Sequence, residues 1–142
     1  MDVNVKRFFC EDLTFVKNLI KSLIRLTQLA VPYLEKTKGS IVNVSSISGI
    51  CAFPAVTYYC MSKAAVDKFT ECLAQELAPK GIRVNAVNPA LIVTSLHRRA
   101  YMSEEEYKDE VAQGILYLAR DATFTTGELL KIDGGKSLLV PR

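Results

Sequence analysis

The N-terminal part of the chain has apolar residues at the spacing of an amphipathic helix. Between Asp12 and Tyr33 they recur with a period of about 3.6 residues, which places them on one helix face. Lysine, asparagine and serine interrupt the stretch from Phe15 to Ile24, so no membrane span is predicted there. The apolar positions are Phe15, Leu19, Ile20, Leu23, Leu26, Leu29 and Ala30.

Three short apolar runs further along the chain predict strands, and two longer segments predict helices. One helix is Thr57 to Ala78, which is rich in alanine and is closed by Pro79 and Gly81. The other is Glu104 to Leu118, with Gly114 as a weak point near its middle. Strands that alternate with helices predict an α/β fold with a parallel sheet and right-handed crossovers. The predicted strands are Ile41 to Val44, Ile82 to Val87 and Leu129 to Ile132.

Composition and charge narrow the class of protein only a little. The chain has 142 residues, 49% of them apolar, and a net charge of +3 with scattered basic residues, which predicts one domain and no nucleic-acid surface. The sequence start has no signal-peptide organisation. The four cysteines have no C-x-x-C spacing and accompany a single histidine, so we expect reduced thiols and no metal site. These features together predict a cytoplasmic protein.

The most informative polar residues are Tyr59 and Lys63, four positions apart on the second predicted helix. Positions i and i+4 share a helix face, so Ser46 at the preceding strand end can reach the same space. A phenol has an ordinary pKa of about 10, and a neighbouring cation favours its ionised form. The three residues outline a proton-transfer site. The same spacing also occurs in ordinary surface pairs, so the flanking sequence must decide.

The flanking sequence resembles the short-chain dehydrogenase/reductase family over most of the chain from Leu26 to Leu138. The segments that carry the resemblance, in order, are Gly39 to Gly49, Tyr59 to Lys63, Gly81 to Pro89, Thr126-Gly127 and Asp133 to Gly135. Within the family, the chain is most similar in character to 3-oxoacyl carrier-protein reductases and secondary-alcohol dehydrogenases. The resemblance implies a partial Rossmann-like fold, with a doubly wound parallel sheet.

The resemblance also implies a function, that of an oxidoreductase which uses NAD or NADP to interconvert an alcohol and a carbonyl. Tyr59 would be the general acid in reduction and the general base in oxidation. Lys63 would stabilise the phenolate and hold the nicotinamide ribose, and Ser46 would orient the reacting oxygen. Tyr59 and Lys63 would therefore serve catalysis and cofactor binding together. The residues lining the nicotinamide end would be Pro89, Ile92 and Thr94.

Two neighbours of these residues are predicted to have structural roles. Ser45 faces away from Ser46 on an extended strand. Tyr58 has Lys63 at i+5, on a different side of the helix, and is predicted to pack or to border the substrate pocket.

The resemblance further points to Asn4 as a catalytic asparagine. In the family its stretch runs almost directly into a segment like Leu26 to Leu34, whereas here the insert Cys10 to Arg25 intervenes. An insert that lengthens the helix would move Asn4 by roughly 24 Å, out of reach of the site. A looped-out insert would keep Asn4 in place. The amphipathic pattern of the insert favours the helix.

The sequence contains no glycine-rich turn of the kind that cradles pyrophosphate after the first strand of such folds. Gly134-Gly135 follows the last predicted strand and predicts a plain turn. Compared with the family, the chain starts after the fourth strand, so we expect residues 1–142 to form a single incomplete domain without the N-terminal cofactor-binding strands. Ala90 replaces a glycine common in the family, and its methyl group could crowd the cofactor if the backbone needs a positive φ.

Two functions stay open at this point. The first is the oxidoreductase, acting on a small alcohol or carbonyl. The second is a catalytically inert fragment, truncated or misspliced, that serves at most as an oligomerisation module. The family builds its subunit interface from helices corresponding to Asp12 to Tyr33 and Thr57 to Ala78, so the resemblance implies a homo-oligomer. The uncovered strands also predict self-association or partial unfolding of the monomer.

Overall fold

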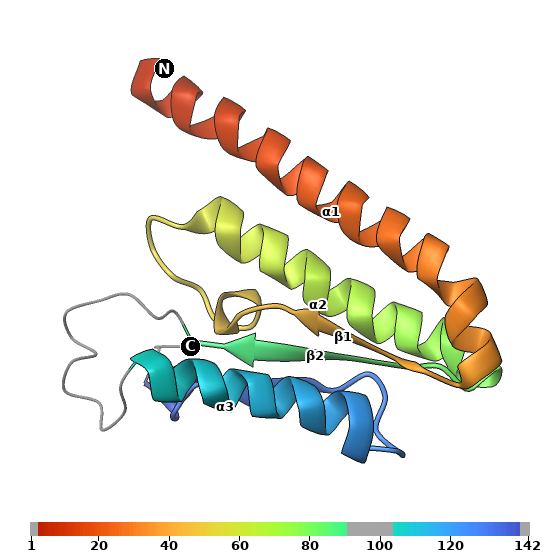
Figure 1. The fold of residues 1–142 in the computed structure, drawn as a ribbon. Helices are drawn as coiled ribbons and strands as arrows, with labels where there is room; N and C mark the ends of the chain where they lie inside the picture. The colour runs from red at the N-terminus through yellow and green to blue at the C-terminus, as the bar shows by residue number, and fades with distance from the viewer. Residues whose placement is uncertain (1–2, 91–103, 140–142) are drawn as a thin grey trace.

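The computed structural model describes residues 3–90 and 104–139, with side chains described for residues 14–90 and 108–139. The chain forms three layers (Figure 1). Helices α1 (Val3–Thr37) and α2 (Thr57–Leu77) lie on one face of a sheet, and α3 (Glu104–Leu116) covers the other face. The predicted placement of helices on both faces is therefore confirmed.

The sheet has three parallel strands in the order β1-β2-β3. These are β1 (Ser40–Val44), β2 (Arg83–Pro89) and β3 (Leu129–Ile132). Ile41 pairs with Val84, and Ala86 pairs with Leu129. The predicted strands, their parallel direction and the α/β class are confirmed, with shifts of one or two residues at strand ends.

Two apolar cores lie on opposite faces of the sheet, and β2 contributes to both. Under α1 and α2, Val84 is fully buried with Leu77 of α2. Under α3, Val87 is fully buried with Leu118. Successive side chains of a strand point to opposite faces, so a central strand covered on both sides can supply apolar side chains to both cores.

The end of α2 follows the signals in its sequence. The helix stops at Leu77 and passes into the 3-10 turn η2 (Ala78–Lys80), and Gly81 follows with a φ of 75°. Proline lacks the N–H that would continue a helix, and glycine takes the left-handed conformation at little cost. The predicted closure by Pro79 and Gly81 is confirmed.

Gly114 lies where α3 passes close to β3. A Cβ atom at this position would lie 2.2 Å from Cδ1 of Ile132, so a larger residue would displace the Ile132 side chain. Beyond Leu116 the chain widens into the π-helical turn η4 (Tyr117–Asp121). Gly114 is therefore a packing position and not a break in the predicted helix.

Helix α1 is one uninterrupted helix of 35 residues. It contains both the predicted helix and the segment Cys10 to Arg25, so the looped-out alternative for that segment is wrong. Among its described side chains, Val31 and Leu34 near the C-terminal end pack on the core. The N-terminal part of the helix extends past α2 (Figure 1). Within the described residues, no helix combines the length and apolar character needed to cross a membrane.

Candidate active site

Ser46 lies at the carboxyl end of β1, where ligands bind in open parallel sheets. It is 1% exposed and caps the 3-10 turn η1 (Ile47–Gly49). Its hydroxyl oxygen accepts a hydrogen bond from the N–H of Ser48 at 3.2 Å and donates to the carbonyl of Pro89 at 3.4 Å. Ser46 thus connects the ends of β1 and β2.

Tyr59 and Lys63 lie on neighbouring turns of α2, with their side chains in contact. The Lys63 Nζ atom is 5.6 Å from the centroid of the Tyr59 ring, within the range of a cation–π interaction. The same Nζ donates a hydrogen bond to the carbonyl of Val44 at 3.1 Å. Burial lowers the pKa of Lys63, and the charge of Asp67 opposes this shift. The structure therefore brings this predicted pair together beside the end of β1.

The segment that carries Ser46 is fastened to the same part of α2. The Ser45 hydroxyl donates to the carbonyl of Lys63 at 3.2 Å, which fits the structural role predicted for Ser45. Gly49 lies directly against the helix, since a Cβ there would be 2.1 Å from Oδ2 of Asp67 and 2.9 Å from the Lys63 carbonyl. A glycine is needed for this close approach. Tyr58 is 6% exposed, consistent with packing.

Two further polar residues lie beneath the site and were not singled out from the sequence. Asn88 of β2 is fully buried, and Asp67 of α2 is 5% exposed. The Asn88 Nδ2 atom donates to the Ser46 carbonyl at 2.9 Å and to the Asp67 carboxylate oxygens at 3.0 and 3.1 Å. Burial raises the pKa of Asp67, and the hydrogen bonds from Asn88 oppose this shift. The position of Asp67 at i+4 from Lys63 was the available signal.

The remaining predicted site residues have different outcomes. Pro89 ends β2 beside Ser46, whereas Ile92 and Thr94 lie outside the described residues. Asn4 belongs to the first turns of α1, and its side chain is not among those described. Because α1 is continuous, the segment Cys10 to Arg25 lengthens the helix by roughly 24 Å. The catalytic role of Asn4 stays a prediction, and a continuous helix is the arrangement that does not favour it.

Ala90 causes no backbone strain. Positive φ among the described non-glycine residues occurs at Lys38 and Ala55, so Ala90 does not need the conformation that favours glycine. It is buried, and its N–H donates to the carbonyl of Ile132 at 3.2 Å. The predicted conflict between its methyl group and a positive φ is therefore absent.

The described residues fit one end of a nicotinamide cofactor and not the other. Lys63 and Ser46 offer donors suited to the nicotinamide ribose and a substrate oxygen, at the carboxyl ends of two parallel strands. The space beside Gly49 is occupied by the Asp67 carboxylate, so Gly49 offers no cradle for a phosphate. The turn after β3 is closed by Asp133, whose carboxylate accepts the N–H groups of Gly135 and Ser137, both at 2.9 Å.

The amino-acid sequence of the chain is similar to those of known proteins. A family model described as "Enoyl-(Acyl carrier protein) reductase" matches residues 13–137. A 3-oxoacyl-[acyl-carrier-protein] reductase of Thermotoga maritima is 41% identical over 140 residues, covering 88% of this chain and 57% of that protein. The chain thus spans little more than half the length of this curated relative.

Solved structures of related proteins also match the chain over about half of their length. The crystal structure of glucose dehydrogenase of Caenorhabditis elegans, in its apo form, matches with a TM-score of 0.74 and 37% identity, over 84% of this chain and 55% of that one. ElxO with NADP bound matches with a TM-score of 0.63 and 36% identity, over 77% of this chain and 51% of that one. The Rossmann-like class predicted from the sequence is confirmed by these likenesses.

Proposed function

The chain belongs to the short-chain dehydrogenase/reductase family, and we propose that it carries an alcohol–carbonyl oxidoreductase site built from Ser46, Tyr59 and Lys63. One observation carries the proposal. The Lys63 ammonium contacts both the Tyr59 ring and the Val44 carbonyl at the end of β1, beside the strand end that holds Ser46. The proposed cofactor is NAD or NADP, since ElxO, a relative, binds NADP. The proposed substrate is a small alcohol or carbonyl compound.

Each side chain has a distinct role in the proposed reaction. The bound cofactor supplies or accepts the hydride. The Tyr59 hydroxyl donates a proton to the carbonyl oxygen during reduction and takes it back during oxidation. The Lys63 ammonium stabilises the phenolate and offers donors to the nicotinamide ribose. The 3.4 Å bond from Ser46 to Pro89 is long for a hydroxyl donor, so the hydroxyl can exchange it for the substrate oxygen.

The test is the variant Tyr59→Phe, which keeps the ring and removes the transferable proton. Turnover of a carbonyl substrate with NADH or NADPH should fall by about a hundredfold or more. Tyr117→Phe is the matched control, because Tyr117 is 50% exposed on η4, on the other face of the sheet. Full turnover in Tyr59→Phe would refute the assignment of the proton donor.

An oligomerisation module is the second candidate function, and exposed apolar residues favour it. Leu26, Leu29 and Tyr33 are 67%, 52% and 72% exposed on α1, at spacings that place them on one helix face. We propose a homo-oligomer that buries this face together with α2.

The described cysteines, Cys51, Cys60 and Cys72, are free thiols, which supports a cytoplasmic location as part of the proposal.

Leu29→Lys tests the module separately from the chemistry. A charge at a buried interface should reduce the molecular mass measured by light scattering, and Gln28→Lys on the neighbouring exposed position is the control. A reduced mass in Leu29→Lys, combined with no turnover in the wild-type chain, supports the inert module. Turnover that depends on Tyr59 supports the enzyme.

A further inference from the structure

Asp67 is a buried carboxylate to which the proposed reaction assigns no step. It lies one helical turn after Lys63, is 5% exposed, and faces the turn η1 that follows Ser46. A carboxylate is rarely buried unless charge or hydrogen bonds compensate the lost hydration. The partners of Asp67 therefore indicate what holds it there.

The side-chain amide of Asn88, the principal partner of Asp67, can donate hydrogen bonds to the carboxylate in one orientation only. The Nδ2 group donates to the Ser46 carbonyl at 2.9 Å and to both Asp67 oxygens at 3.0 and 3.1 Å. All three atoms are acceptors, so a rotated amide would place its own oxygen against them. The Asn88 Oδ1 atom has no hydrogen-bond partner among the described residues. The carboxylate and the Ser46 carbonyl together fix the amide.

The contacts around this amide join the two halves of the candidate site. Through Asn88, the carboxylate of α2 is connected to the backbone of Ser46 at the end of β1. Gly49 packs on the same carboxylate, and the Ser45 hydroxyl binds the Lys63 carbonyl. These contacts together hold the Ser46 segment at one place on the Lys63 turn.

We infer that Asp67 is a positioning residue, which fixes Ser46 through Asn88 and keeps a negative charge one turn from the Lys63 ammonium. This inference deepens the proposed function and rests on it for the roles of Ser46 and Lys63. Loss of the negative charge weakens both effects together. Asn88 then loses its charged acceptor, and Lys63 loses the interaction that favours its protonated form.

A titration of the wild-type chain by nuclear magnetic resonance tests the connection without any substitution. The Asn88 side-chain amide protons and the Ser46 carbonyl carbon should shift with the same midpoint as the Asp67 carboxyl carbon. Asn85 is the internal control, because it is also fully buried on β2 but binds the backbone of Thr125 and Glu128, each at 2.9 Å. Resonances of Asn88 that stay constant through the Asp67 titration would overturn the inference.

The variant Asp67→Asn tests the same point at neutral and alkaline pH. The pKa of Lys63, followed through its ε-carbon resonance, should fall below its wild-type value, and Asp67→Glu should restore it. Glu71→Gln, which removes a charge one turn further along α2, is the matched control. In turnover assays, Asp67→Asn should lower kcat by about tenfold to a hundredfold with a smaller effect on KM.

The outcomes separate this inference from the proposed function. If Asp67→Asn leaves the Lys63 pKa and the Ser46 carbonyl resonance at their wild-type values, the positioning role is wrong, whatever the activity. If both resonances respond as expected but the wild-type chain has no turnover, the coupling stands and the proposed function fails.

Discussion

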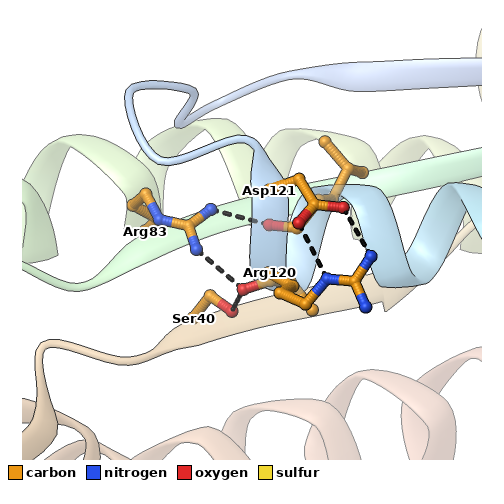
Figure 2. Close-up of polar contacts among 6 residues, drawn as sticks. Ser40, Arg83, Arg120 and Asp121 are labelled. Carbon is orange, nitrogen blue, oxygen red and sulfur yellow. Dashed lines mark hydrogen bonds and ion pairs between the residues drawn. The ribbon is translucent and has the colours of Figure 1, made fainter.

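Arg83 connects the start of β2 to the end of the helical layer on the α3 face (Figure 2). Its guanidinium donates to the carbonyls of Leu118, Ala119 and Ala122 at 2.6, 2.8 and 2.9 Å. The Ser40 hydroxyl donates to the carbonyl of Ala119 at 3.1 Å. Carbonyls at a helix end lack partners within the helix, and the rigid fork of a guanidinium can bind several at once.

Replacing Arg83 with methionine should therefore destabilise the fold. It removes the guanidinium from three carbonyls, one of them on the fully buried Leu118, while the Ala119 carbonyl keeps the Ser40 hydroxyl. The expected cost is about 2 kcal/mol. Urea unfolding measures this change. Arg120→Met is the control, because Arg120 pairs with the adjacent Asp121 at the surface (Figure 2) and exposed pairs contribute little. Equal stability of the two variants would contradict this account of Arg83.

Lys63 should give the stability of the chain a specific pH dependence. Burial lowers its pKa in the folded state, with Asp67 opposing, so between that pKa and the ordinary value of about 10.4 the unfolded chain binds more protons. The contribution of Lys63 to stability therefore rises as pH rises through this window. The stability of Lys63→Met relative to wild type should fall over the same range, whereas Lys21→Met on exposed α1 should show no such trend.

The local part of the site was predictable from the sequence, and the part beneath it was not. Tyr59 and Lys63 meet because both belong to one helix, where spacing alone fixes the face. Asn88 reaches Asp67 and Ser46 only because β2 lies beside β1 under α2. This juxtaposition depends on tertiary packing between residues far apart in the chain, and hydrophobic periodicity does not report it.

At the scale of elements, local sequence signals predicted the helices, whereas contacts that depend on tertiary packing were not predicted. The start of α2 and its closure were predicted, because turn residues signal them locally. Gly114 was taken as a weak point of a helix, whereas it permits contact with β3. The reach of α1 beyond Asp12 was indicated through the segment Cys10 to Arg25, whose amphipathic pattern favoured a helix continuing from the Asn4 stretch.

The stability supplied by α1 should come from its C-terminal part. Leu34 packs on the core shared with α2, whereas Leu26 is 67% exposed on the same helix. In dilute solution, Leu34→Ala should lower the free energy of unfolding by about 2 kcal/mol, and Leu26→Ala should change it by less than about 0.5 kcal/mol. A comparable loss in both variants, measured by denaturant unfolding, would show that the N-terminal part of α1 also supports the fold.

At the scale of the whole molecule, β1 is an edge strand of the described sheet. The Ser45 N–H donates a hydrogen bond to the Val87 carbonyl of β2. Because backbone groups alternate in direction along a strand, the N–H and carbonyl of Val44 point away from β2, toward the open edge. The Val44 carbonyl is bound by Lys63, and its side chain is 52% exposed. An apolar edge of this kind favours association with another chain.

The chain should therefore self-associate, and a charge at the β1 edge should reduce the association. Light scattering over a dilution series should give a smaller mass for Val44→Lys than for wild type. Phe124→Lys is the control, since Phe124 is fully exposed away from this edge. A wild-type chain that is strictly monomeric and well protected from hydrogen exchange would contradict the expectation of an incomplete domain.

Cofactor binding should be weak in the 142-residue chain. The described residues provide donors for the nicotinamide ribose and no cradle for the pyrophosphate, where helix N-termini and backbone N–H groups supply much of the affinity. Isothermal titration should give far weaker binding of NADP(H) or NAD(H) than for ElxO, the relative with NADP bound. Micromolar affinity for either cofactor would contradict this prediction.

The central position of β2 also determines how the molecule comes apart. Because Val84 belongs to one core and Val87 to the other, neither core can be lost without exposing the strand that supports its counterpart. The sheet, α2 and α3 should consequently melt as one cooperative unit, with equal calorimetric and van't Hoff enthalpies. The turns of α1 from Thr14 to Leu26, whose side chains are exposed or half-buried and belong to neither core, should open on their own at much lower free energy.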